Sequence, residues 1–237
     1  MITLRAVSNL NAILDALGVE TRDSLLARLE RVSLRIGDVI EQPDERFGYA
    51  YLPIDCVLSA TVVMGDGDEV EIATIGYEGF HPMSVLLGAT HSLIRTVCQV
   101  PGESYRMPID DFTQALRQYP TFRAQADLFG QGAIVFMSQS IACNRRHPLL
   151  ERCARWLLMT HDRVRGADFR LTQEYLAVML GVRRPAVSLA AQTLQNAGLI
   201  AYRRGSIRVL DRAGLEAVSC ECYRVVADAF QRLVGEP

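Results

Sequence analysis

One stretch of the chain, from Gln173 to Gln192, has the pattern of two short helices that meet at a tight turn. Leu176, Ala177 and Leu180 repeat at the spacing of one helical face, so the first helix has an apolar stripe. Gly181 follows at the position of the turn, where glycine adopts a positive φ at little cost. This arrangement is that of a helix-turn-helix, a unit whose second helix lies in the major groove of DNA.

The second helix of this unit is expected from about Arg184 to Asn196. Pro185 falls in its first turn, where the missing N–H costs little, and Gly198 is a C-cap glycine. Arg183 and Arg184 stand at the N-terminal end, which reaches base edges in helix-turn-helix proteins. The alternative is an ordinary helical hairpin in a core, which would not need the basic hairpin that follows.

The segments on both sides complete a winged helix. Phe169–Leu171 is a short predicted strand, and Thr172 is a candidate N-cap for the first helix. Leu199–Leu210 is predicted to be a hairpin with a basic turn, which is the wing. A final helix is expected from Arg212 to Val234.

The N-terminal half has a different periodicity. Two helical pieces are expected between Leu10 and Leu34, separated by Gly18. From Val32 to Arg106, short apolar or alternating runs such as Val57–Val63 are separated by turn residues, and Gly65–Asp68 is a good hairpin turn. Strands at this spacing predict an antiparallel roll or barrel.

A long helix is expected between the two halves, from about Thr121 to Asn144, after a short helix that Pro108 opens. It is apolar over much of its circumference, so it should be covered on two sides. One side fits the roll, and the other fits the same helix of a second subunit or, alternatively, more of its own core. Arg145–Pro148 is the predicted hinge, because proline disfavours helix at the residue before it. We therefore predict an α+β fold with a β-roll sensor domain at 1–118, a central dimerisation helix and hinge at 119–146, and a winged helix-turn-helix domain at 147–237.

Charge is unevenly spread along the chain. The formal net charge is −2, yet the stretch from Arg145 to Arg212 holds 13 arginines and five acidic residues, an excess of eight positive charges. A basic C-terminal part is expected where one end of a protein meets phosphates. No apolar run reaches the roughly 18 residues that a membrane span needs. Met1–Arg5 also lacks a signal-peptide pattern, so a cytoplasmic protein without a membrane partner is expected.

A β-roll, a long central helix, a hinge and a winged helix in this order resemble the Crp/Fnr family of bacterial transcription regulators. The resemblance covers nearly the whole chain and is most specific from Leu171 to Leu210. It implies a cyclic-nucleotide-binding-like roll and a homodimer whose central helices form the seam. It further implies double-stranded DNA of two-fold symmetry and RNA polymerase as partners. The two recognition helices would enter successive major grooves, about 34–36 Å apart.

The resemblance assigns base-reading roles to two positions of the second helix. Arg184 aligns with an arginine that can take a guanine bidentately, and Ser188 with the serine of a Glu-x-x-Ser-Arg motif. Pro185 and Leu189 stand where that motif has glutamate and arginine, so the usual family half-site is not expected. The residues expected to contact phosphates are Thr172, Gln173, Arg203 and Arg204. The full set of candidate DNA-binding residues is Thr172, Gln173, Arg183, Arg184, Ser188, Gln192, Arg203 and Arg204.

The ligand end of the family pattern is incomplete. Members that bind cyclic nucleotides carry Gly-Glu for the ribose and, further along, Arg-Ser/Thr-Ala for the phosphate. Arg95–Thr96 resembles the start of the Arg-Ser/Thr-Ala motif. Pro82–Met83 stand at the positions of Gly-Glu, and neither residue can bind the ribose as that pair does. Glu78 could substitute only if the loop took a different path. The candidate pocket residues are therefore Glu78, Arg95 and Thr96, a cyclic nucleotide is a disfavoured ligand, and no other cofactor is indicated.

Six cysteines are present without a CxxC pair, so neither a structural zinc site nor any other metal site is predicted. In a cytosolic protein they are expected to be core or incidental thiols rather than disulfides. Oxygen-sensing relatives hold an iron–sulfur cluster near the N-terminus, but no cysteine precedes Cys56. The histidines leave haem binding open, although a lone histidine is more often structural. The cysteines are Cys56, Cys98, Cys143, Cys153, Cys220 and Cys222, and the histidines are His81, His91, His147 and His161.

Three classes of function compete. The leading one is a dimeric, sequence-specific DNA-binding regulator with the roll as its signal input. The second is a ligand-binding sensor that acts through protein partners, in which case deletion of residues 147–237 leaves its function intact. The third, an enzyme, is not expected, because the chain has no Ser/His/Asp set, P-loop, GxGxxG or metal-ligand spacing.

Overall fold

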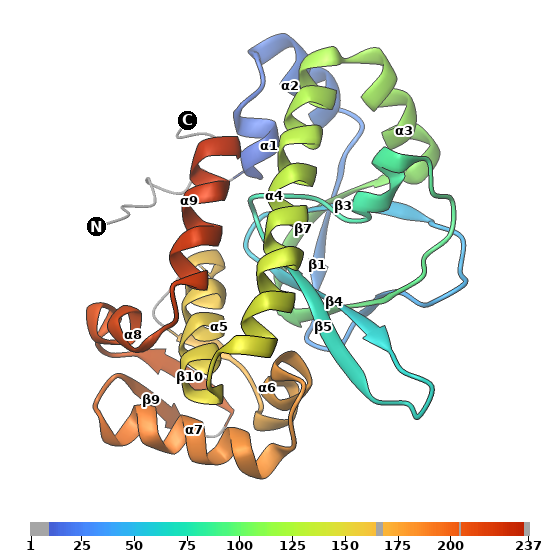
Figure 1. The fold of residues 1–237 in the computed structure, drawn as a ribbon. Coiled ribbons are helices and arrows are strands. Elements are labelled where there is room, and N and C mark those ends of the chain that lie inside the picture. Colours follow the sequence, from blue (N-terminus) through green and yellow to red (C-terminus); the bar gives the residue numbers. More distant parts are fainter. Residues whose placement is uncertain (1–9, 165–167, 204, 235–237) are drawn as a thin grey trace.

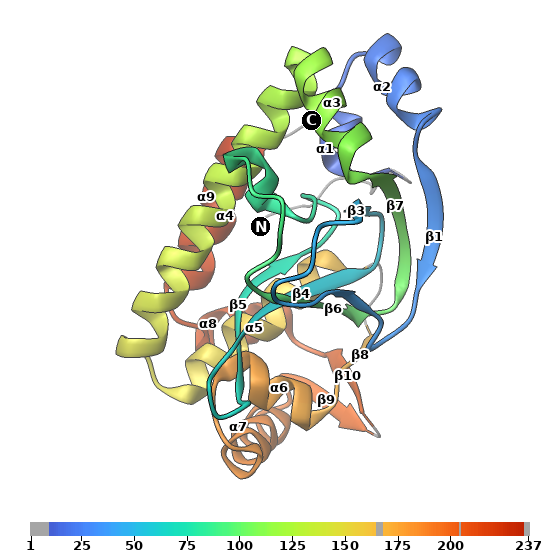
Figure 2. The same cartoon turned by 90° about the vertical axis from the view of Figure 1, so that its right-hand side faces the viewer.

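The structure is a computed structural model that describes residues 10–164, 168–203 and 205–234 (Figure 1). Antiparallel sheets form the N-terminal half, one long helix crosses the middle, and helices with a small sheet form the C-terminal end. The C-terminal domain lies against one end of the roll, and the long helix runs beside the roll towards it (Figures 1 and 2). The predicted α+β fold class is confirmed.

The first described residues form two short helices and a strand. The helices are α1 (Ala12–Asp15) and α2 (Val19–Leu26). Gly18 separates them, as the sequence predicts. The expectation of helix as far as Leu34 is wrong, because Glu30–Leu34 form strand β1. Along its whole length β1 pairs with another strand of the roll, and this pairing outweighs the helical spacing of the leucines.

The roll consists of two antiparallel sheets and a 3-10 helix. Its further elements are β2 (Val39–Glu41), β3 (Tyr49–Pro53), β4 (Val57–Val63), β5 (Glu69–Ile75), the 3-10 helix η1 (Met83–Leu87), β6 (Arg95–Val100) and β7 (Gly102–Pro108). One sheet has the order β1-β7-β3 and the other the order β2-β6-β4-β5. The β4–β5 hairpin turns at Gly65–Asp68, as predicted. Buried side chains from both sheets, including Leu52 and Leu58, belong to one apolar core.

Two helices follow the roll, α3 (Ile109–Gln118) and the long predicted helix α4 (Pro120–Arg146). Phe122 and Phe129 of α4 pack into the core of the roll, where their rings meet Phe112 and Phe80. Gly79 permits this packing, because a Cβ at that position would lie 2.0 Å from the Phe129 ring. The first half of α4 is therefore anchored to the roll by aromatic contacts.

Another face of α4 is covered by a helix of the same chain. This helix, α9 (Cys222–Val234), runs back along α4 (Figure 1). Gly132 admits the Phe230 ring, because a Cβ on Gly132 would lie 2.8 Å from it. The chain's own C-terminal helix thus fills part of the side that we expected a second subunit to cover. Ile134 and Ile141 of α4 remain 56% and 74% exposed.

The C-terminal domain begins after the hinge. His147 and Pro148 are extended between the end of α4 and the start of the next helix, as the proline predicts. The elements are α5 (Leu149–Arg163), β8 (Asp168–Arg170), α6 (Gln173–Leu180), α7 (Arg184–Asn196), β9 (Ile200–Arg203), β10 (Ser206–Val209), α8 (Arg212–Val218) and α9. The strands form a sheet in the order β8-β10-β9. Among the residues described, no helix is long and apolar enough to cross a membrane.

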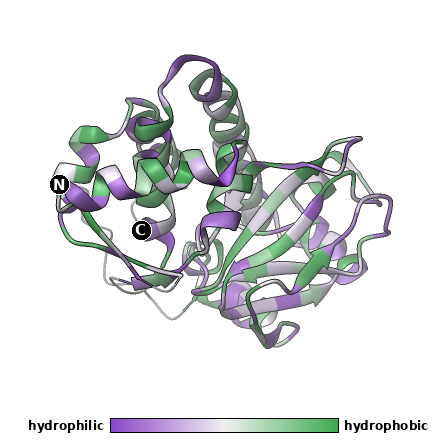
Figure 3. Cartoon of the chain, turned by 90° about the horizontal axis from the view of Figure 1, so that it is seen from below, coloured by the Kyte–Doolittle hydropathy of each residue, from purple (hydrophilic) through white to green (hydrophobic). Residues whose placement is uncertain are grey.

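Hydrophobic and hydrophilic residues are mixed within the individual helices and strands. Figure 3 shows both kinds of residue along the same helix and along the same strand. Elements of this kind bury one face and leave the other to solvent. Helix α7 of the C-terminal domain is of this kind, with Val187 buried and Arg184 exposed.

The single final helix that we expected from Arg212 to Val234 is wrong. The segment forms two helices, α8 and α9, and Ser219 after α8 is extended, with a ψ of 153°. Leu215 of α8 and Val226 of α9 both lie in the core of the C-terminal domain, and α9 in addition runs along α4. One straight helix would not bury Leu215 in this core and also run along α4.

Candidate nucleic-acid interface and its junction with the roll

Helices α6 and α7 and the turn between them form the predicted helix-turn-helix. Thr172 caps α6, because its Oγ1 accepts a hydrogen bond of 3.2 Å from the backbone N–H of Tyr175. Gly181 ends α6 in the left-handed conformation, with a φ of 61°. Leu176 and Leu180 are buried in the core of the domain, so the predicted apolar stripe faces inward.

Helix α7 buries one face and exposes the other. Val187 and Leu194 lie in the domain core. Arg183 and Arg184, at the start of the helix, are exposed, and so is Gln192, about two turns further along. Figure 1 shows α7 at the outer edge of the C-terminal domain, away from the roll. The side chains of Arg183, Arg184 and Gln192 are therefore open to a partner.

Two of the candidate DNA-binding residues are bonded to each other. The Ser188 hydroxyl lies 2.7 Å from Gln173 Oε1 and 3.1 Å from the backbone carbonyl of Arg184, so its one proton is shared inside the protein. Both side chains are half-buried, whereas Thr172 at the start of α6 is exposed. Ser188 and Gln173 thus hold the two helices together. Ser188 would have to release its proton from these bonds to donate to DNA, whereas the Gln173 Nε2 group does not take part in this bond.

The predicted wing is the hairpin of β9 and β10, paired from Ser206↔Arg203 to Val209↔Ile200. Arg203 is exposed at its turn, and Arg204 lies outside the described residues. Arg208 is bound on the same sheet by the carboxylate of Asp168, so its charge is already paired. Arg203 is therefore the described wing cation that best fits a phosphate contact.

Part of the positive charge of the C-terminal domain is internal. Arg155 and Arg163 are each only 7% exposed. Arg212 lies 2.6 Å from Asp162 and 2.8 Å from Glu216. The excess of arginine in the sequence therefore overstates the charge that DNA would meet.

The roll and the C-terminal domain meet at a buried carboxyl, Glu71 of β5. One oxygen accepts hydrogen bonds from Trp156 Nε1 of α5 at 2.8 Å and from the Thr74 hydroxyl at 3.0 Å, and the other accepts one from the Ser59 hydroxyl at 2.6 Å. Burial raises the pKa of Glu71 to about 7, although these hydrogen bonds and Arg163 act in the opposite direction. The protonation state of Glu71 thus bears directly on a contact between the two domains.

A second polar contact joins the same two domains. Arg163 of α5 donates to Glu78 Oε1 at 2.7 Å, and the two side chains are only 8% and 12% exposed. Gly76 allows Arg163 to approach, because a Cβ on Gly76 would lie 2.8 Å from its side chain. Glu78 is therefore part of the junction between the domains.

The candidate ligand residues Glu78 and Arg95 are not brought together. Arg95 lies 2.7 Å from Glu69, at the first residue of β5, whereas Glu78 follows the last residue of that strand. Thr96 is fully buried beside Arg95 on β6. A pocket that uses Glu78 for a ribose and Arg95 for its phosphate would have to span the length of β5, about 20 Å. No single nucleotide site is formed by these residues.

The histidines of the roll and α5 have polar partners. His81 Nε2 lies 2.8 Å from Glu41 Oε2 in a buried pair, next to the start of η1. His91 bonds to the Thr90 hydroxyl, and His161 to Arg212. The structural interpretation therefore accounts for these three histidines.

Comparisons with known proteins agree with this architecture. A Crp-like helix-turn-helix domain model matches residues 151–218. No curated protein matches the sequence. Among solved structures, FixK2 from Bradyrhizobium japonicum is similar with a TM-score of 0.65 and 15% identity, over 81% of this chain and 98% of that one. The c-di-GMP responsive global regulator CLP from Xanthomonas campestris has a TM-score of 0.61 and 16% identity, over 81% of this chain and 99% of that one. A Crp/Fnr-family transcriptional regulator from Thermus thermophilus has a TM-score of 0.58 and 21% identity, over 80% of this chain and 98% of that one.

The chain has the Crp/Fnr fold and a Crp-like helix-turn-helix domain. The predicted resemblance to Crp/Fnr regulators is thereby confirmed. Within the Crp/Fnr pattern, helix α7 departs where the sequence indicated: Pro185 is exposed and Leu189 is 67% exposed. An apolar side chain thus stands where many Crp/Fnr members place a second arginine.

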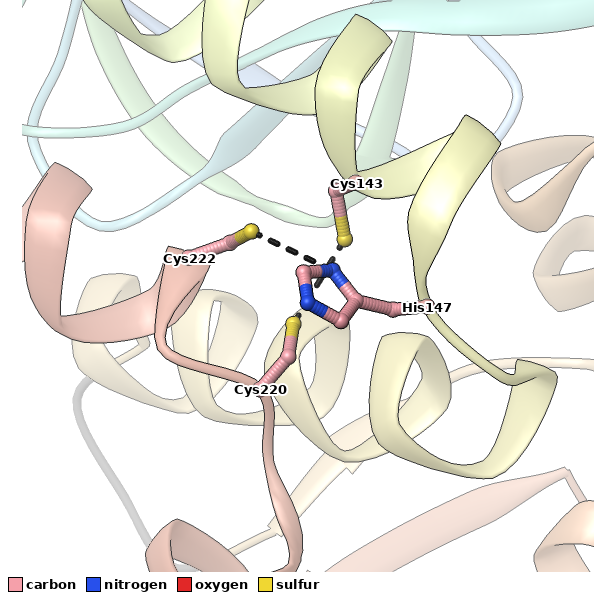
Figure 4. A group of neighbouring side chains, drawn as sticks. All are labelled: Cys143, His147, Cys220 and Cys222. Atoms are coloured by element: carbon pink, nitrogen blue, oxygen red, sulfur yellow. Dashed lines mark hydrogen bonds between the residues drawn. The ribbon is translucent and has the colours of Figure 1, made fainter.

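Sequence reasoning missed one cluster, which lies where α4 ends. Cys143, His147, Cys220 and Cys222 come together, with one ligand atom from each lying within 4.8 Å of the others (Figure 4). The cluster contains no CxxC pair, but two other signals are present in the sequence. Cys143 and His147 are four residues apart at the end of a helix and so share a face, and Cys220–Cys222 is a CxC pair where the expected final helix breaks.

Proposed function

We propose that the chain is a sequence-specific DNA-binding transcription regulator that acts in the cytoplasm. The observation that carries the proposal is the exposed start of α7, where Arg183 and Arg184 stand on an open surface of a Crp-like helix-turn-helix domain. Transcription regulation by DNA binding involves no catalysed reaction, so we assign the chain no enzymatic activity.

The exposed face of α7 suggests how bases are read. Arg184 suits a guanine, because its guanidinium can bind O6 and N7 together. Leu189 and Pro185 offer apolar contact, for which the thymine methyl group is the matching feature in the major groove. Thr172 and Arg203 flank the helix and suit phosphates. The operator should therefore differ from one read by a second arginine at the position of Leu189.

We further propose that the protein acts as a homodimer. The exposed Ile134 and Ile141 lie seven residues apart, and so on one face of α4, and a second copy of α4 would remove them from water. Two recognition helices would then read a two-fold symmetric site, with RNA polymerase as the further partner that the family resemblance implies. Exposure of both isoleucines in a monomer would be unfavourable, because large apolar side chains are stabilised by burial.

The roll supplies the signal input, without a complete cyclic-nucleotide cassette. Glu78 is held by Arg163, and Arg95 by Glu69, so neither is poised for a nucleotide in this structure. The contacts of Glu71 and Glu78 with α5 give the roll a direct route to the position of the DNA-binding domain. The signal that uses this route differs in chemistry from a nucleotide bound by the family's usual residues.

The test is selection of random duplexes by the purified protein, with and without cyclic AMP or cyclic GMP, followed by sequencing. A two-fold symmetric consensus that is independent of nucleotide is expected. Enrichment only with nucleotide would contradict the proposed loss of the cassette. Absence of enrichment in every condition, together with function retained after deletion of residues 147–237, would favour a sensor that acts through protein partners.

A further inference from the structure

The cysteine–histidine cluster lies where three helices meet. Cys143 is near the end of α4, His147 follows α4 at the hinge, and Cys220 and Cys222 stand at the break between α8 and α9 (Figure 4). All three thiols are buried, with exposures of 0%, 5% and 0% for Cys143, Cys220 and Cys222. The four side chains point towards a common centre (Figure 4).

We propose that Cys143, His147, Cys220 and Cys222 form a binding site for one tetrahedral thiophilic metal ion, and that Zn²⁺ is the ion they fit. Three thiolates and one imidazole are a recurring ligand set for zinc. Soft sulfur ligands in tetrahedral geometry disfavour magnesium, calcium and manganese.

The spacing of the ligand atoms supports a single ion. A tetrahedral zinc ion with Zn–S bonds of about 2.3 Å places its sulfur ligands about 3.8 Å apart. In the structure the sulfurs of Cys143 and Cys220 are 3.5 Å apart, and the sulfur of Cys222 is 3.5 Å from Nδ1 of His147. Every mutual distance is within 4.8 Å, so small movements of the four side chains would bring their ligand atoms to the spacing of one ion. A cluster of several irons would need ligands spread more widely.

His147 is oriented as a metal ligand. Its Nε2 lies 3.1 Å from the carboxylate of Glu221, which stabilises the tautomer with the proton on Nε2. The lone pair of Nδ1 is then directed towards the thiols. A carboxylate that holds the second nitrogen of a ligating histidine is a common outer partner of zinc sites. Simple packing of three thiols would require neither this histidine nor its orientation.

One polar neighbour can stabilise a thiolate in the cluster. Gln139 donates its side-chain N–H to the sulfur of Cys222 at 3.1 Å. Zinc is bound by thiolate rather than by thiol, so this N–H donor is placed to stabilise the charged form of Cys222.

The location gives the site a consequence for the fold. A bound ion would join the end of α4, the hinge residue His147 and the start of α9 into one unit. It would therefore limit the freedom of the hinge between the long helix and the DNA-binding domain. This inference does not depend on DNA binding and is tested without it.

The first experiment uses the full-length wild-type protein, reduced with a phosphine and freed of metal by a chelator. Titration with Zn²⁺ against a chromophoric chelator should show one ion per chain. Titration with Co²⁺ should give thiolate-to-cobalt charge-transfer absorption and the visible bands of a tetrahedral site. Zn²⁺ should also raise the Tm of the wild-type protein, because an ion bound only by the folded state stabilises it.

Variants then assign the ligands. Cys143→Ser and His147→Ala should each lower the Zn²⁺ affinity by at least about 100-fold, and Glu221→Gln by about 10-fold. Cys153→Ala is the matched control, because Cys153 is also fully buried but lies outside the cluster. Circular dichroism checks that each variant is folded. Since Glu221 is 72% exposed, its substitution tests the proposal even if a ligand variant does not fold.

Several results would overturn the proposal. The first is that the reduced wild-type protein binds no stoichiometric Zn²⁺ or Co²⁺. The second is that Cys143→Ser binds Zn²⁺ as tightly as Cys153→Ala does. Anaerobic incubation with iron and sulfide could yield an iron–sulfur chromophore that Zn²⁺ does not displace, and the cluster would then hold several irons instead of one ion.

Discussion

The helix-turn-helix exposes polar side chains to solvent, whereas the roll buries several of its own. On α7 the arginines at the N-terminal end are exposed and face solvent. In the roll, Glu41, Glu71 and Glu78 are buried or nearly so, and each already bonds to a side chain of the protein. A surface with exposed donors is ready for an external partner, whereas a buried group that is bonded within the protein acts on structure. The roll therefore affects function through its contacts with the other domain.

The largest effect is expected from breaking the buried pair of Glu78 and Arg163. Arg163→Met should destabilise the protein by about 3–5 kcal/mol, because it leaves a buried carboxylate without its partner. Urea unfolding gives the change in the free energy of unfolding.

The control for this prediction is the double variant with Glu78→Gln added to Arg163→Met. It should recover much of the loss, since no uncompensated charge remains. If Arg163→Met lowers the free energy of unfolding by less than about 1 kcal/mol, the pair behaves like a surface contact. The contrast between buried polar groups of the roll and exposed ones of α7 would then fail.

The next effect concerns pH and Glu71. Because its pKa is raised from the ordinary 4.5 to about 7, the folded protein binds more protons than the unfolded chain between these pH values. The stability contributed by this group is fully present below about pH 4.5 and is lost as the pH rises to about 7. The loss is about 3 kcal/mol in total.

Glu71→Gln should remove this part of the pH dependence. Urea unfolding of both proteins across the range measures it, and the single tryptophan, Trp156, reports the site directly because it donates to Glu71. If the free energy of unfolding depends on pH in the same way for the wild type and for Glu71→Gln, the Glu71 carboxyl does not titrate between the domains. Arg163 is the cation whose field acts on Glu71, so Arg163→Met should raise the Trp156 titration midpoint.

On the open face, Arg184→Ala should weaken binding to the selected operator by about 1–3 kcal/mol and relax the preference at one base pair. Fluorescence anisotropy with operator and random duplexes measures both quantities. Arg35→Ala, which removes an exposed arginine of the roll, is the control. If Arg184→Ala binds both duplexes as the wild type does, the recognition helix has been placed wrongly.

The smallest effect is expected at the wing. Arg203→Ala should weaken binding to all duplexes alike and reduce the slope of log affinity against log salt by about 1, as loss of one phosphate contact does. Binding at several salt concentrations measures the slope. A change in base preference instead would assign Arg203 to sequence reading.

The helix-turn-helix could be predicted in detail because its signals are local. Thr172 as N-cap, Gly181 at positive φ and the bounds of α7 all follow from neighbouring residues. The wing was predictable for the same reason. The junction was not, because the bond from Trp156 to Glu71 joins positions 85 residues apart. Glu78 was singled out as a ligand group, and no local pattern shows that Arg163 holds it.

The sequence by itself determined the order of the parts: a roll, a long helix, a hinge and a winged helix. Periodicity, turn residues and caps act over a few residues, so they can be read along the chain. Only the tertiary structure decided that α9 turns back to cover α4 and that Cys143 and His147 meet Cys220 and Cys222. These contacts depend on which apolar faces are left to bury once the local elements have formed, and that is a property of the assembled surfaces.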